Sequence, residues 1–139
     1  MPMTKRRYPA LLVLLASLSA MTGCQDTRRA LQQARDTLAR TLPAPYFEDL
    51  VTESVSVEGN RLVLLVRSPT GDADKTRQVP GFDALRQSEQ QQMASLCALP
   101  AVQSLRGTDA VLVRRFVDRH DTLFFETELP VSECPAPPA

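Results

Sequence analysis

The segment CALPAVQSLRGTDAVLVRRFVDRHDTLFFETELPVSEC, residues 97 to 134, decides the fold that the sequence predicts. It begins with the end of a helix and then breaks at 106–108. Two strands follow, at 110–117 and 122–129, and the turn 118–121 joins them. One cysteine opens the segment and another closes it. This arrangement predicts a helix linked across a β-hairpin.

The N-terminus has the parts of an export signal. A basic KRR run at 5–7 precedes the apolar run ALLVLLASLSA at 10–20. This run is too short to span about 30 Å of hydrocarbon, which disfavours a transmembrane helix. The TGC ending at 22–24 is similar to a bacterial lipobox. We therefore expect residues 1–23 to be a lipoprotein signal peptide and Cys24 to be lipidated. The alternative is an ordinary secretory signal with a chance cysteine.

The residues after Cys24 predict where the protein is anchored. In enteric bacteria, aspartate directly after the lipidated cysteine favours retention in the inner membrane. Here Gln25 takes that place and Asp26 comes one position later. The sequence therefore predicts a lipid-anchored protein on the periplasmic face of the outer membrane. Removal of residues 1–23 leaves 13 basic against 16 acidic side chains, and this balance argues against a nucleic-acid partner.

The predicted export of the protein indicates how the cysteines pair. The chain has three, and with Cys24 assigned to lipid, Cys97 and Cys134 remain. Two cysteines in an exported domain favour a disulfide. The alternative, a redox-active pair, lacks a C-x-x-C spacing. Closing the loop between them stabilises the fold by roughly 4 kcal/mol on the chain-entropy model.

The rest of the chain supplies two helices and two strands. Residues 25–41 predict a polar helix, which either packs weakly on the domain or tethers it to the lipid. Alternation predicts a strand at 50–58, and apolar residues on both faces predict a central strand at 61–68. A polar loop at 69–80 leads to a helix at 82–97, with Asp83 as its cap and 87–92 in solvent.

Together these elements predict an α+β fold. It has a small antiparallel sheet of about four strands, helices mainly on one face and one disulfide. The lipidated N-terminus, polar helix and linker occupy 24–45, the α+β domain occupies 46–134, and a disordered tail occupies 135–139.

Five apolar side chains of the predicted strands are candidates for partner binding. They would share the face of the sheet away from the long helix, where an uncovered apolar patch marks a binding surface. The alternative is that the N-terminal helix, or a different strand register, covers them. These residues are Val63, Leu65, Leu112, Phe116 and Phe124.

The sequence does not indicate catalysis, a cofactor or a metal. His120 is the only histidine, and a hairpin turn is a poor place for a catalytic base held by packing. A single histidine beside acids also lacks the spacing that specifies zinc. Glu126 and Glu128 share a strand face as a general acid and base do, but no cleft is implied. They fit the solvated side of an edge strand better. We therefore expect a protein that is not an enzyme.

The order of several motifs resembles the small pilotin lipoproteins of bacterial type II secretion. The motifs are TLP at 41–43 after a polar helix, LPAV at 99–102 after Cys97, then Gly107, and Cys134 after a strand-turn-strand unit. The same outline resembles a broader group of uncharacterised periplasmic lipoproteins with a C…P…G…C ending. The family's usual glycine in the last turn is absent here.

The pilotin resemblance implies a function. In that family the domain binds a C-terminal segment of the secretin, and the lipid carries the complex to the outer membrane. The expected partners are thus the membrane and a secretin or another envelope protein, with a groove between sheet and helix as the binding site. The alternative function is a stand-alone structural or stress-related envelope lipoprotein.

Overall fold

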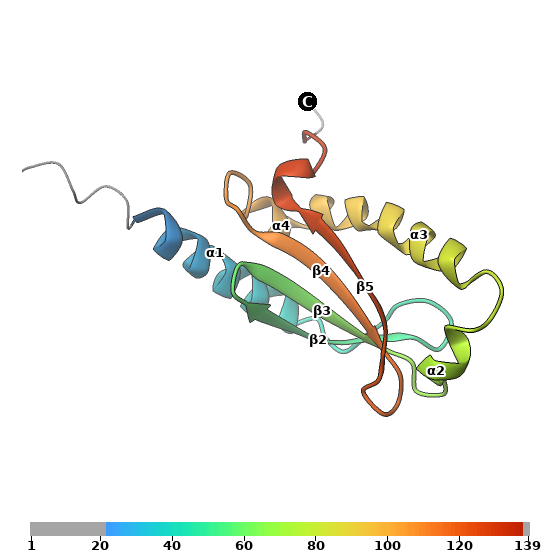
Figure 1. The fold of residues 1–139 in the computed structure, drawn as a ribbon. Coiled ribbons are helices and arrows are strands. Elements are labelled where there is room, and N and C mark those ends of the chain that lie inside the picture. The colour runs from blue at the N-terminus through green and yellow to red at the C-terminus, as the bar shows by residue number, and fades with distance from the viewer. Residues whose placement is uncertain (1–21, 138–139) are drawn as a thin grey trace, which may run out of the picture.

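The computed structural model describes residues 22–137, so most of the predicted signal peptide lies outside the described part. Within these residues one sheet has the order β1-β2-β3-β4-β5. Its strands are β1 (Ala44–Pro45), β2 (Val51–Glu58), β3 (Arg61–Arg67), β4 (Val111–Val117) and β5 (Leu123–Pro130). The helices are α1 (Thr22–Ala39), α2 (Ala73–Thr76), α3 (Phe82–Gln92) and α4 (Pro100–Gln103), with the 3-10 helices η1 (Met93–Ala98) and η2 (Val131–Glu133). The combination of a single sheet, helices and one disulfide is confirmed (Figure 1).

The sheet is mixed, which corrects the prediction of an antiparallel one. β3 and β4 run parallel, with Leu62 beside Leu112 and Val66 beside Phe116. The other neighbouring strands are antiparallel. Parallel neighbours need a long crossover connection, and the chain between β3 and β4 supplies one that carries α2, α3, η1 and α4. Local patterns predicted the strands β2 to β5 and the helix over 82–97, but they did not determine which strands pair.

β1 is the strand that the sequence pattern missed, so the sheet has five strands in the described part rather than about four. Its two residues pair with Thr52 and Val51 of β2. The prolines on this segment predicted a break, and they do keep the strand short. Pro45 has no amide hydrogen to donate, and proline is tolerated at the edge of a sheet.

A bulge lets β2 keep one apolar face although Glu53 interrupts its pattern. The register with β3 shifts between Thr52 and Ser54. Beyond the shift, Val55 and Val57 pack against the main core. Arg67 Nε donates a hydrogen bond to Glu53 Oε2 at 2.5 Å. The extra residue in the bulge thus turns the carboxylate of Glu53 away from the face that carries Val55 and Val57.

The main core lies between the sheet and the helices. Leu31 and Ala34 of α1 are buried in it, so the polar helix packs on the domain, which was one of its two expected roles. α1 and α3 lie on the same side of the sheet (Figure 1). The other buried members of this core are Leu62, Leu64, Met93, Leu96, Cys97, Ala101, Val102, Leu105, Ala110, Leu112 and Val131.

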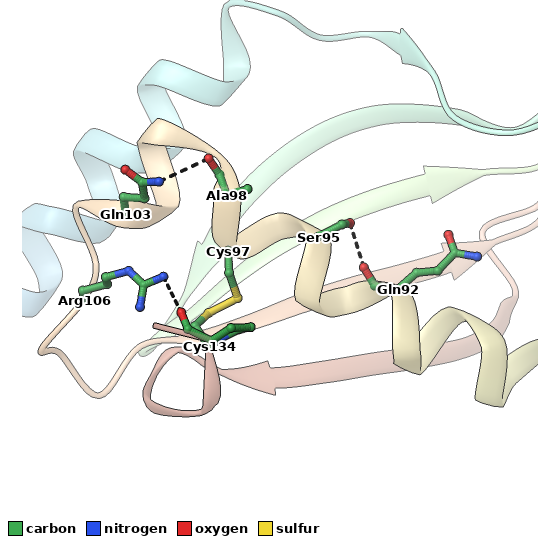
Figure 2. The surroundings of a disulfide bond; sticks show 8 residues. Gln92, Ser95, Cys97, Ala98, Gln103, Arg106 and Cys134 are labelled. Atoms are coloured by element: carbon green, nitrogen blue, oxygen red, sulfur yellow. Dashed lines mark hydrogen bonds between the residues drawn. A yellow bond between two sulfur atoms is a disulfide. The ribbon is translucent and has the colours of Figure 1, made fainter. Parts of the chain in front are cut away.

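The predicted disulfide joins Cys97 of η1 to Cys134, which follows η2 (Figure 2). The two Cα atoms are 5.7 Å apart. Both cysteines pack on the main core. Beside the bridge, Arg106 Nη2 donates to the carbonyl of Pro135 at 2.8 Å. The bridge therefore links the helical crossover to the end of the last strand, as the sequence predicted.

The predicted helix at 82–97 divides into α3 and η1. Gly81, with φ of 91°, is the residue before the first turn, and Asp83 lies inside that turn. The prediction of Asp83 as the cap is therefore wrong. Glycine occupies the cap because it adopts positive φ without a Cβ penalty.

The polar segment 69–80 folds against the β4–β5 turn instead of remaining a plain loop. It contains α2, whose buried Ala73 donates its N–H to Asp118 Oδ2 at 2.9 Å. Asp118 Oδ1 accepts from the N–H groups of His120 at 2.7 Å and Thr122 at 3.0 Å. These donors, the Ala73 N–H above all, lower the pKa of Asp118. α2 is thereby held against the hairpin.

The turn between β4 and β5 lacks the glycine that the resemblance to pilotins led us to expect. Asp121 has φ of 66°. Aspartate is one of the few non-glycine residues that tolerate this left-handed conformation in turns. The turn therefore keeps its geometry with a different residue.

Candidate binding pocket

An apolar pocket of about 180 Å³ opens between α3, the loop after β1 and the ends of three strands. Phe82, Leu85 and Glu89 line it from α3, at a spacing of three and four residues that places them on one face of the helix. The other lining residues are Phe47, Leu50, Val66, Ser68, Gly71, Thr76, Phe116, Val117, Phe124 and Phe125.

Aromatic rings form the base of the pocket. Phe116 of β4 and Phe125 of β5 lie with their ring centroids 4.6 Å apart. Phe82 meets Phe125 edge-on at 5.7 Å, and Tyr46 meets Phe116 edge-on at 5.9 Å. Such contacts contribute about 0.5–1.5 kcal/mol beyond area burial. The base is therefore a packed surface held by both strands and α3.

The mouth of the pocket is unusually apolar. The exposed large apolar residues in the described part are Phe47 (64% exposed), Val79 (56%), Leu85 (48%) and Leu123 (41%). Phe47 and Leu85 line the pocket, Val79 lies just before α3, and Leu123 is next to Phe124. Two exposed apolar side chains at the edge of one apolar pocket, Phe47 and Leu85, mark an interaction site.

A partly buried chain of hydrogen bonds runs from Arg114 through Tyr46 to Glu89. Arg114 Nη1 donates to the Tyr46 hydroxyl at 3.1 Å, and its guanidinium carbon lies 4.9 Å from the centre of the Tyr46 ring. The Tyr46 hydroxyl donates in turn to Glu89 Oε2 at 2.5 Å. Burial and the hydrogen bond to Glu89 raise the pKa of Tyr46 to about 12, against the opposing effect of Arg114. Tyr46 is therefore a neutral donor.

The structure separates the five predicted partner-binding residues. Phe116 and Phe124 line the pocket, whereas Leu112 is fully buried in the main core. Val63 and Leu65 point to the opposite face of the sheet, because neighbouring residues of a strand alternate between faces. The expectation that all five share a face is wrong. The parallel register sets Leu112 beside Leu62, not beside Val63, so the odd residues of β3 lie on the other face of the sheet from the even residues of β4.

The face of the sheet away from the helices is charged. Arg61 pairs with Glu126 at 3.2 Å and Glu128 at 2.5 Å. Arg115 pairs with Glu126 at 2.6 Å and Glu58 at 2.8 Å. Partial burial opposes ionisation of Glu126, but the two arginines outweigh it and lower its pKa. Glu126 and Glu128 thus lie on the partly solvated side of edge strand β5, and the patch expected on this face is absent from the described residues.

Glu89 is a residue of the pocket that sequence reasoning missed. The run 87–92 was predicted to lie in solvent, yet Glu89 is buried. It comes four residues after Leu85 and four before the buried Met93, on the same helical stripe. That spacing was the available signal. Phe47 and Leu50 had no such signal, because they lie outside any periodic segment.

The remaining sequence candidates do not form a site. Within residues 22–137 no helix combines the length and the apolar character needed to cross a membrane. No group of three His, Cys, Asp or Glu residues in that range is arranged to hold a metal. His120 is exposed in its turn, where Arg119 Nε donates to its Nε2 at 2.9 Å. The pocket itself offers apolar surface and one carboxylate, which suits binding.

Comparison of the sequence with known protein families and with curated proteins finds no match. The fold does have relatives among solved structures. A Pseudomonas aeruginosa protein described as a "putative secreted protein" superposes with a TM-score of 0.61 at 18% identity, covering 81% of this chain and 96% of that chain.

Two further structural relatives are pilotins. EpsS of the Vibrio vulnificus type 2 secretion system has a TM-score of 0.52 at 16% identity, covering 81% of this chain and 98% of that chain. The type II secretion pilotin AspS of Vibrio cholerae has a TM-score of 0.52 at 17% identity, covering 79% of this chain and 96% of that chain. The chain therefore has a pilotin-like fold, and the resemblance inferred from the sequence is confirmed at that level.

Proposed function

We propose that this protein is an outer-membrane-anchored periplasmic lipoprotein that binds a partner polypeptide in the apolar pocket, as a pilotin for a type II secretion secretin. The observation that carries the proposal is the exposure of Phe47 and Leu85 at the mouth of an aromatic pocket. The fold shared with EpsS and AspS supports a secretin as the partner.

The size of the pocket supports a polypeptide rather than a small molecule. At about 180 Å³ it is smaller than the roughly 300–1,000 Å³ of typical small-molecule sites. A polypeptide segment needs to insert only one or two apolar anchors and can spread over the exposed rim. Phe47 and Leu85 would flank such an anchor. The proposed occupant is an apolar segment near the C-terminus of the secretin.

Replacing Leu85 by aspartate is expected to weaken capture of the secretin by at least about 30-fold, because a charge would replace an apolar contact at the centre of the interface. The measurement is recovery of the secretin subunit with the tagged, full-length lipoprotein from detergent-solubilised envelopes. Leu85 is about half exposed, so the variant should remain folded, and its thermal unfolding is recorded alongside.

Gln87→Asp is the matched control. It adds the same charge two residues further along α3, at an exposed position that does not line the pocket, and capture should stay near the wild-type level. If wild-type protein recovers no secretin, the pilotin proposal fails and the stand-alone envelope lipoprotein becomes the better hypothesis. Equal losses in both variants would place binding elsewhere.

The anchor is part of the same proposal. Cys24→Ala is expected to abolish incorporation of labelled palmitate and to remove the protein from the outer-membrane fraction. Each buried methylene contributes about 0.8 kcal/mol, so stable attachment depends on the acyl chains. Fractionation of envelopes by density measures the change. A variant that still co-sediments with the outer membrane would refute lipid anchoring at Cys24.

A further inference from the structure

We infer that the pocket selects a partner segment in which a lysine or arginine accompanies the apolar anchor, and that the Glu89 carboxylate receives this cation. The inference rests on the proposed function, because it names the chemistry of the segment that the pocket would bind. It adds a determinant of specificity, since apolar contacts alone accept many sequences.

Glu89 is placed to receive a cation inside an otherwise apolar site. Its side chain lines the pocket between the aromatic base and α3, and the residue is only 7% exposed. Oε2 accepts the hydrogen bond from Tyr46. Among the described residues Oε1 accepts none, and Glu89 forms no ion pair. A partner that covers the pocket would shield this oxygen from water, and burying a carboxylate is costly unless its acceptors are filled.

The guanidinium of Arg114 does not fill that role. Arg114 donates to the Tyr46 hydroxyl, so Tyr46 stands between the guanidinium and the carboxylate. Because the phenol is neutral, it can orient Glu89 but cannot neutralise it. The chain from Arg114 through Tyr46 to Glu89 therefore fixes one oxygen and leaves the other for a ligand. A hydrogen bond between two charged groups is about twice as strong as one between neutral groups.

Two arginines from the segments that line the pocket are engaged elsewhere. Arg77 pairs with Asp74 and also donates to the carbonyl of Leu123 at 2.9 Å. Arg86 lies 3.4 Å from Asp83 on α3. Neither is paired with Glu89. A neutral or acidic partner segment would bury Glu89 further without supplying a positive charge, whereas a lysine or arginine would supply a charged donor for Oε1.

The test uses three probes that differ in one group: phenylbutylammonium, phenylbutanol and phenylbutyrate. Each is titrated into the purified full-length protein, and binding is followed by NMR shifts of the pocket residues. The ammonium should bind at least about tenfold more tightly than the alcohol, and the carboxylate most weakly. In Glu89→Gln the advantage of the ammonium over the alcohol should disappear.

Glu48→Gln is the control for general electrostatic attraction, because it removes a carboxylate from an exposed position beside Phe47. It should keep the preference for the ammonium. Equal binding of ammonium and alcohol to wild-type protein would overturn the inference and leave the apolar pocket intact as a binding site. If no probe shifts the pocket resonances, both the inference and the proposed use of the pocket fail. The wild-type comparison decides the question even if Glu89→Gln does not fold.

Discussion

The double substitution of Cys97 and Cys134 by serine is expected to lower the free energy of unfolding by about 4 kcal/mol. The two residues are 37 positions apart, and without the bridge the unfolded chain regains the entropy of closing that loop. A small domain has a total stability of roughly 5–15 kcal/mol, so the expected loss is a large fraction of the free energy of unfolding. Urea unfolding followed by circular dichroism measures it.

Reduction provides an independent control for this prediction. Treating the wild-type protein with dithiothreitol should reproduce the loss, and the same treatment should leave the unfolding curve of the double serine variant unchanged. A loss below about 1 kcal/mol would contradict the view that the bridge joins two parts that would otherwise separate readily. Loss of the bridge should also disrupt the pocket, because the bridge ties η1, which continues α3, to the end of β5.

Replacing Leu112 by alanine is expected to cost about 2–5 kcal/mol, the range for removing a buried leucine side chain from a packed core. Leu112 is fully buried, and in the sheet it lies between Leu62 of β3 and Leu129 of β5. The cavity would thus open at the centre of the sheet. The measurement is again the free energy of unfolding in urea.

Leu65→Ala is the comparison for Leu112→Ala. Leu65 lies on the opposite face and is only half-buried, so its loss should be clearly smaller. Because Leu112 does not line the pocket, the folded Leu112→Ala protein should still capture the secretin. A stable Leu112→Ala variant with impaired capture would instead support the placement on a binding face that the sequence first suggested.

These two leucines show where sequence reasoning succeeds and where it stops. The apolar residues on both faces of 61–68 and the strand pattern of 110–117 correctly predicted both strands. It did not reveal that the strands are parallel neighbours, nor that Leu112 lies beside Leu62. A shift of register by one residue moves every side chain of a strand to the other face. The face shared by residues of two strands therefore depends on pairing that no local pattern contains.

The bulge at Glu53 and the short strand β1 illustrate the same limit. Glu53 interrupts the apolar alternation of 50–58, but the register shift that turns its side chain to the other face is a property of the pair β2–β3. β1 is a strand only because β2 lies beside it. Its two residues lack the length and the composition of a strand by themselves.

Local chemistry in the sequence was enough for the order of the main helices and strands and for the pairing of Cys97 with Cys134. Each of these follows from periodicity, from turn residues or from the expectation that Cys24 is lipidated, which leaves two cysteines to pair. The pocket was decided by tertiary structure alone. Phe47, Leu85, Phe116 and Phe124 belong to four separate segments, and they meet because the crossover returns α3 to the ends of the strands. Burial of Glu89 beside Tyr46 depends on the same long-range packing, since the two residues are 43 positions apart.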